Sequence, residues 1–218
     1  MNVMCPVAVD PVASACKRTI VWTARMIALI AMSAAVSAQA PGGAAPLYTQ
    51  DDLRFLHHMI VHHEQALELA ALVPSRTKRD ALKEFARQVD RGQRVEIDHM
   101  TSLLTLAADR GLSVPHEQLH GTAPMPGILS RMRMDAIAAA TGAEFDRLWL
   151  EGMIEHHEGA LTMGRAHQRQ QFESGRQPYG IDVLVDEILV VQRAEITTMK
   201  QWLAEWGLVS TDPATRAP

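Results

Sequence analysis

The chain has 218 residues, a formal net charge of −4 and an apolar fraction of 47%. This length allows one domain with a sizeable core, or at most two small ones. Charged residues make up 21% and aromatic residues only 5%. This composition excludes a disordered chain and favours helices over sheets.

The first 40 residues have the pattern of a secretory signal peptide. A basic stretch ending at Arg25 precedes the uncharged apolar run 26–36, and Ala38-Gln39-Ala40 is a small-x-small cleavage site. The apolar run is too short to span a membrane. We therefore predict a periplasmic or secreted protein, cleaved after Ala40 and not attached to a membrane afterwards. An uncleaved anchor is the alternative.

Cleavage at this site would change the chemistry available to the chain. It would remove Cys5 and Cys16, the two cysteines of the sequence. Disulfides, thiolate metal sites and a cysteine nucleophile would then be excluded. It would also remove three basic residues and one acidic residue, which takes the net charge from −4 to −6. Such a chain lacks the basic surface that binds nucleic acid, so we expect no nucleic-acid partner.

Helical periodicity and breaker residues predict the elements that follow a flexible leader at 41–48. Thr49 and Asp52 have the spacing of a capping box. Helices are predicted at 49–73, 77–110, 128–140, 143–171 and 181–206, with breaks at Pro74-Ser75, Gly111, Thr141-Gly142 and Gly207. We expect one helical unit at 49–207, composed of a first repeat at 49–110, a linker with a short helix at 111–142, and a second repeat at 143–207, before a tail at 208–218.

The two repeats are copies of one helical hairpin. DDLRFLHHMIVHHEQALELA at 51–70 aligns with FDRLWLEGMIEHHEGALTMG at 145–164, at an offset of 94. QRVEIDHM at 93–100 aligns with QRAEITTM at 192–199, at an offset of 99. Two long matches in the same order indicate a duplication. Because each hairpin alone would expose its apolar stripe, we expect the two to pack together about an approximate two-fold axis.

Each hairpin places polar residues on faces that are otherwise apolar. In the second helix of each hairpin, an apolar stripe is interrupted only by Gln93 and Glu96, or by Gln192 and Glu195. In the first helix, a methionine and a His-His pair lie on or beside the apolar face; these residues are Met59, His62, His63, Met153, His156 and His157.

A buried carboxylate is costly unless it is paired, so each Glu is expected to face the histidines of its hairpin. Two interpretations of this pattern are open. The first is a polar layer that fixes the register between helices. The second is a metal site in which His and Met are ligands, and Glu is either a ligand or the hydrogen-bond partner of one.

Two motifs carry a resemblance to a known family. Residues 153–163 contain Met-x-x-His-His followed by Gly-Ala and a further Met, and residues 192–199 contain Gln-x-x-Glu-Ile-x-x-Met. With these motifs the chain resembles the domain-of-unknown-function 305 family over most of residues 48–206. The resemblance implies a ferritin-like four-helix bundle in small exported bacterial proteins, some of which are associated with copper binding and copper resistance.

The resemblance also implies a set of metal ligands. Carried over residue by residue, they are Met59, His62, His63, Glu96, Met100, Met153, His156, His157, Met163, Glu195 and Met199. The first repeat departs from the family pattern, with Leu69 in place of the Met and Gln65 in place of the Gly. Met125-Pro126-Gly127 resembles a further family element, although Ile128 stands where a Met is expected.

Copper is the leading metal, with zinc second, because thioethers favour Cu(I) and imidazole suits copper in either oxidation state. We therefore predict an exported copper-binding protein that is not an enzyme. A metal-free helical module that binds a partner is one alternative. A di-iron carboxylate oxidase is another, but it requires Glu-x-x-His on two helices. Glu96 and His99 have this spacing, whereas Glu195 is followed by Thr198.

The remaining histidines are predicted to have no ligand role. His116 and His120 lie in a Gly- and Pro-rich loop, where solvated side chains are expected, although their i, i+4 spacing would allow them to chelate a metal if that segment were helical. A similar interpretation applies to His57 and His58, and His167 is expected at the surface.

Overall fold

Five helices make up the described part of the chain. The computed structural model describes residues 47–115 and 125–209, which lie within one unit, Ala44–Pro218. The helices are α1 (Gln50–Arg76), α2 (Asp80–Ala108), α4 (Arg131–Ala139), α5 (Gly142–Glu173) and α6 (Ile181–Glu205). These ranges contain no strand, so the predicted all-helical class is confirmed. The expected signal peptide, residues 41–46 of the expected leader, the His116 and His120 positions and most of the expected tail lie outside them. The leader was expected to be flexible up to residue 48, but Tyr48 is fully buried and its hydroxyl donates to the carbonyl of Tyr179 at 3.0 Å.

Three helix ends match the capping residues that the sequence predicts. Thr49 and Asp52 form the predicted capping box at the start of α1, each side chain accepting from the backbone N–H of the other. Gly111 and Gly207 follow the ends of α2 and α6 with φ of 75° and 65°, in the left-handed region that glycine tolerates best. Within the described ranges, no helix has the length and apolarity that a membrane crossing requires.

Three predicted boundaries are corrected by the structure. Helix α1 continues past Pro74 to Arg76, although this proline lacks the N–H that would bond to residue 70 and its ring crowds the carbonyl there. Helix α2 begins at Asp80 rather than Thr77, whose extended backbone lies before the helix and whose Oγ1 accepts from the N–H of Arg79. Helix α4 begins at Arg131 rather than Ile128, after Ser130 caps it.

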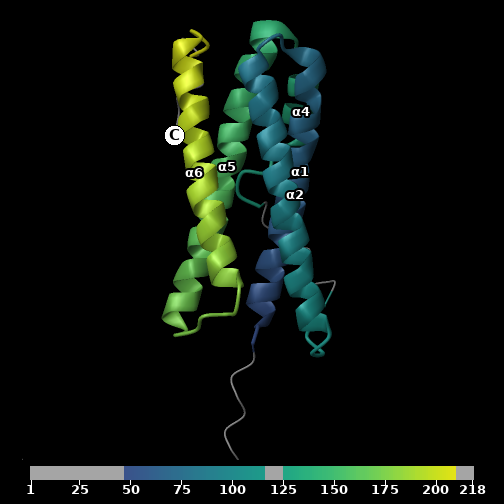
Figure 1. The fold of residues 1–218 in the computed structure, drawn as a ribbon, viewed down its shortest axis with the longest axis vertical. Coiled ribbons are helices and arrows are strands. Elements are labelled where there is room, and N and C mark those ends of the chain that lie inside the picture. Colours follow the sequence, from purple (N-terminus) through teal and green to yellow (C-terminus); the bar gives the residue numbers. More distant parts are fainter. Residues whose placement is uncertain (1–46, 116–124, 210–218) are drawn as a thin grey trace, which may run out of the picture. The chain divides into compact units, whose positions relative to one another are not determined.

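Helices α1 and α2 form one hairpin, and α5 and α6 form the second. The hairpins meet through α1 and α5, and the short α4 packs on α5 (Figure 1). Trp149, near the start of α5, is buried and donates from Nε1 to the carbonyl of Leu69, near the end of α1, at 2.8 Å. The two inner helices are therefore antiparallel, with the start of each beside the end of the other.

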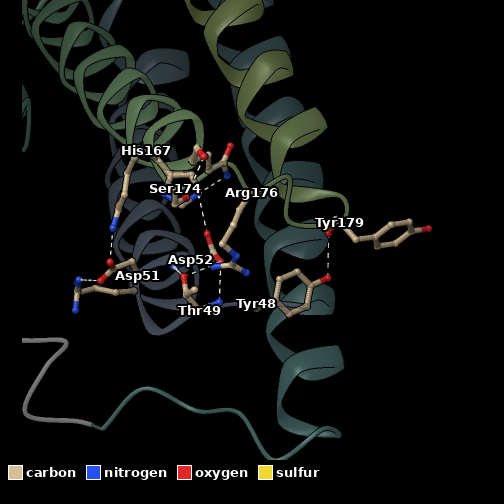
Figure 2. Close-up of polar contacts among 11 residues, drawn as sticks. Tyr48, Thr49, Asp51, Asp52, His167, Ser174, Arg176 and Tyr179 are labelled. Atoms are coloured by element: carbon tan, nitrogen blue, oxygen red, sulfur yellow. Dashed lines mark hydrogen bonds and ion pairs between the residues drawn. The ribbon is translucent and has the colours of Figure 1, made fainter. Parts of the chain in front are cut away.

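A buried aspartate near the start of each inner helix contacts an arginine from the opposite hairpin. Asp146 of α5 accepts from Arg79, which lies between α1 and α2, at 2.9 Å. Its equivalent at the offset of 94, Asp52 of α1, lies 3.4 Å from Arg176, which lies between α5 and α6 (Figure 2). The two contacts are equivalent, as the expected approximate two-fold relation between similar hairpins requires.

His167 was expected at the surface, but it is 4% exposed. Its ring stacks on Phe55 with centroids 4.2 Å apart, and its Nε2 lies 3.4 Å from Asp52 (Figure 2). The position equivalent to Phe55 in the second repeat is Trp149. At the α1–α5 contact the ring of His167 thus packs against Phe55, where the second repeat has the larger Trp149.

We predict that Arg79→Met destabilises the protein more than Arg94→Met. The first change keeps the aliphatic stem but leaves Asp146, which is 2% exposed, without its cation. Breaking a fully buried pair costs ~3–5 kcal/mol, and because Arg79 is 37% exposed we expect a smaller loss of stability, about 2 kcal/mol. Arg94 pairs with Asp90 on the surface, and its loss should cost under about 1 kcal/mol. Urea unfolding of both variants measures the difference, and equal losses would contradict the prediction.

Candidate metal centre

The second histidine of each pair faces the outer helix of its own hairpin. His63 Nε2 lies 2.7 Å from Glu96 Oε2 on α2, and His157 Nε2 lies 2.8 Å from Glu195 Oε2 on α6. Both histidines are fully buried. Each buried imidazole thus meets the carboxylate that interrupts the apolar stripe of the facing helix, as the sequence pattern predicts.

The first histidine of each pair faces the other hairpin instead. The rings of His62 and His156 lie with centroids 3.9 Å apart, at the contact between α1 and α5. Sequence reasoning placed both histidines of a pair opposite one Glu, giving one site per repeat. The structure differs because neighbouring residues on an α-helix point about 100° apart, so a pair cannot face one helix. The four imidazoles form a single cluster between the hairpins.

In each of the four histidines, one ring nitrogen has a hydrogen-bond partner and the other has none. His62 Nε2 lies 3.0 Å from the carbonyl oxygen of Pro126, and His156 Nε2 lies 2.9 Å from the carbonyl oxygen of His62. A carbonyl only accepts, so Nε2 of both rings carries the proton. The Nδ1 atom of each of the four rings is buried and has no hydrogen-bond partner among the protein atoms.

Burial keeps the inner pair of imidazoles neutral. Desolvation, with a smaller contribution from His63, lowers the pKa of His62 to about 3. Desolvation and then the neighbouring His62 hold the pKa of His156 well below its usual value of 6.5. A neutral ring with its proton on Nε2 presents a lone pair at Nδ1, the form of histidine that binds metal.

The predicted methionines divide into two groups by position. Met59, Met100, Met153 and Met199 are fully buried, each within about one turn of a His or Glu of the cluster. Met163 is half-buried and lines a separate hollow of about 230 Å³ with Phe55, His58 and His167. It lies six residues after His157, roughly 9 Å along the helix axis. The structure therefore does not bring Met163 to the histidines.

The two glutamines that interrupt the apolar stripes, Gln93 and Gln192, are buried with side-chain amide atoms that have no hydrogen-bond partner. Gln192 is fully buried and neither its amide oxygen nor its amide nitrogen has a partner, and the amide oxygen of Gln93 is also unpartnered. Both lie one turn before the Glu that contacts a histidine. The sequence pattern located these amides on the buried face, but their lack of partners is visible only in the structure.

Two further contacts at the cluster were missed by sequence reasoning. Pro126 supplies the carbonyl that holds His62, and Gln65 donates to and accepts from the backbone of Leu129, at 3.0 and 2.8 Å. The resemblance of residues 125–127 to a family Met-Pro-Gly element drew attention to Pro126, but it did not indicate a contact with a histidine. The presence of Gln65 where the family has Gly drew attention to Gln65, but it did not indicate the contact with Leu129.

The donor set limits which metal these residues fit. Across residues 47–115 and 125–209, no three His, Cys, Asp or Glu side chains are grouped as a metal site. A zinc site of four nitrogen, oxygen or sulfur ligands and a di-iron carboxylate site both need such a group. The unpartnered Nδ1 atoms of neutral imidazoles are donors of the type that bind a metal ion.

Fold and centre together define a duplicated helical bundle with buried, metal-ligand-type side chains between its two hairpins. The chain belongs to the family named Domain of unknown function (DUF305), whose model matches residues 52–203. This confirms the resemblance seen in the sequence motifs. No curated protein matches the chain.

Three solved structures show what the chain resembles. A DUF305 protein from Streptomyces coelicolor, described as secreted, is 28% identical with a TM-score of 0.60, over 72% of this chain and 92% of that one. A DUF305 fragment from Deinococcus radiodurans is 26% identical with a TM-score of 0.61, over 73% and 99%. CopM in its Cu(I)-bound form is 29% identical with a TM-score of 0.53, over 73% and 98%.

We predict that acid destabilises this protein, because burial opposes protonation of His62 and His156 in the folded state. The unfolded chain binds protons near pH 6.5 while folded His62 does not until about 3, so stability is full above about pH 6.5 and falls as the pH drops below it. We predict a loss of roughly 2–3 kcal/mol from His62 between pH 7 and about 4.5, at ~1.4 kcal/mol per pH unit. Urea unfolding at both pH values measures the loss.

The control for this prediction separates His62 from the other titrating groups. His62→Gln cannot be protonated, so its unfolding free energy should fall less between the two pH values than that of the parent. His99→Gln removes a half-buried histidine of α2 outside the cluster and should behave as the parent does. An unchanged pH dependence in folded His62→Gln would contradict the assignment.

Proposed function

We propose that this protein binds copper as Cu(I) at the buried histidines between its hairpins, with His62 and His156 as the central ligands, and serves copper homeostasis rather than catalysis. The observation that carries the proposal is the set of four buried Nδ1 atoms without partners, on His62, His63, His156 and His157. Each ring is oriented through its other nitrogen, as ligating histidines commonly are. Met59, Met100, Met153 and Met199 are the thioethers nearest in sequence to the cluster.

The likeness to CopM supports copper over other metals. CopM has been solved with Cu(I), Cu(II) and Ag bound and in the apo form. Silver is a soft ion that prefers the same thioether and imidazole donors as Cu(I). The second choice, zinc, is less well served by residues whose carboxylates are already engaged with imidazole Nε2 atoms.

A Cu(I) competition titration tests the proposal. The variant His62→Gln with His156→Gln should bind Cu(I) at least about 100-fold more weakly than the parent, since even changes to hydrogen-bond partners of ligands cost about 10–100-fold. His99→Gln should match the parent. Equal affinity of all three proteins would refute the site and leave the histidines as a structural polar layer.

The single variants distinguish one shared centre from two separate sites. In a shared centre, His62→Gln and His156→Gln should weaken binding to a similar extent, and the double variant should lose little more, because residues that act as a unit are not additive. In two separate sites, each single variant would instead lose one bound copper and leave the other unchanged.

Export is the second part of the proposal. It is supported by the small-x-small site that ends at Ala40 and by the secreted description of the Streptomyces coelicolor relative. We expect the mature protein to begin at Pro41. Intact mass of the protein from a periplasmic or culture fraction measures this directly, and a mature form that retains residues 26–36 would refute cleavage.

A further inference from the structure

One backbone segment crosses the histidine cluster, and we name it the strap, residues Met125–Leu129. Met125 to Ile128 form a turn in which the N–H of Ile128 donates to the carbonyl of Met125 at 3.3 Å. Pro126 and Gly127 occupy the central positions, and Gly127 has φ of 76°. This is the arrangement that a Pro-Gly pair favours, with the proline fixing the first angle and the glycine allowing the second.

The strap touches the cluster through the backbone of Pro126. The carbonyl oxygen of Pro126 lies 3.0 Å from His62 Nε2 and accepts a hydrogen bond from its N–H. Of the four histidines, His63 and His157 are held by glutamates and His156 by the carbonyl of His62. His62 alone is therefore held by a segment that belongs to neither hairpin.

Two residues, Gly159 on α5 and Gln65 on α1, determine how closely the strap packs on the bundle. On α5, Gly159 lets the strap approach, because a Cβ there would overlap the carbonyl oxygen of Pro126. A Cβ at Gly127 would likewise lie 2.7 Å from the carbonyl oxygen of His156. On α1, the Gln65 amide binds both the N–H and the carbonyl of Leu129, at 2.8 and 3.0 Å. Gln65 and Gly159 occupy the same position of the two repeats.

We propose that the strap is the positioning element for His62: the Pro126 carbonyl keeps the proton on Nε2, which leaves Nδ1 to bind the metal. The metal part of this inference rests on the proposed function. Gly159 and Gln65 are positioning residues that act through the strap and are not ligands. Without the strap, His62 could carry its proton on either nitrogen, and a fraction of the rings would present the wrong atom to the ion.

The test uses Gly159→Ala, which displaces the strap, and Gln65→Ala, which releases it without adding a clash. Glu68→Ala, an exposed residue on α1, is the matched control for Gln65→Ala. Gly92→Ala, a helical glycine with no neighbour within 4 Å of its added Cβ, is the control for Gly159→Ala. If Gly159→Ala does not fold, Gln65→Ala carries the test alone.

Two measurements are made on each protein. Long-range ¹H–¹⁵N NMR of the metal-free protein reports the tautomer of His62, which should be the Nε2–H form in the parent and both controls, and mixed in the strap variants. A Cu(I) competition titration should show affinity at least about 10-fold weaker in the strap variants, the size typical for hydrogen-bond partners of ligands.

The outcomes separate this inference from the proposed function. An unchanged His62 tautomer in folded Gln65→Ala and Gly159→Ala would overturn the inference, as would a changed tautomer with parental Cu(I) affinity. Absence of Cu(I) binding by the parent would refute the proposed function, and with it the metal role of the strap. The NMR spectrum would still decide whether the strap sets the proton of His62.

Discussion

Four imidazole rings are buried where the two hairpins meet, and each has one nitrogen without a hydrogen-bond partner among the protein atoms. A buried polar atom left unpaired costs about 1–3 kcal/mol. Protonation does not relieve this cost for the inner pair, because burial holds the pKa of His62 and His156 far below neutral pH. A cation that accepts the Nδ1 lone pairs would relieve it, and ion binding would thereby stabilise the folded protein.

The duplication explains why the rings gather in one place. In each repeat two adjacent histidines point about 100° apart, so His63 and His157 face their own outer helices while His62 and His156 face each other. A single hairpin would leave its first histidine exposed on an apolar face. The contact between hairpins therefore completes the cluster, and neither repeat contains it alone.

The approximate symmetry ends at the strap. One segment between the hairpins cannot serve both halves of a two-fold arrangement, so His62 meets the carbonyl of Pro126 while His156 meets the carbonyl of His62. The same asymmetry accounts for the residues at equivalent positions. Gly159 admits the backbone of the strap, and Gln65, where the family pattern has glycine, binds it through an amide.

The sequence predicted what depends on local pattern. The helical class, the duplicated hairpin, the Thr49 cap and the pairing of His63 and His157 with glutamates all follow from spacing within a helix or between copies. The His62–His156 contact and the burial of His167 were not predicted, because they depend on how the two hairpins pack. The hydrophobic periodicity within one helix does not indicate which of its faces packs against the other hairpin.

The register between the inner helices is set at both ends of their contact. Asp52 and Asp146 each lie ten residues before the inner histidine of their helix, about 15 Å along the axis. Because the helices are antiparallel, their contacts with Arg176 and Arg79 lie on opposite sides of the histidines. A slip of one helix along the other would break both aspartate contacts. The buried aspartates thus hold His62 and His156 beside each other at the midpoint of the contact between the inner helices.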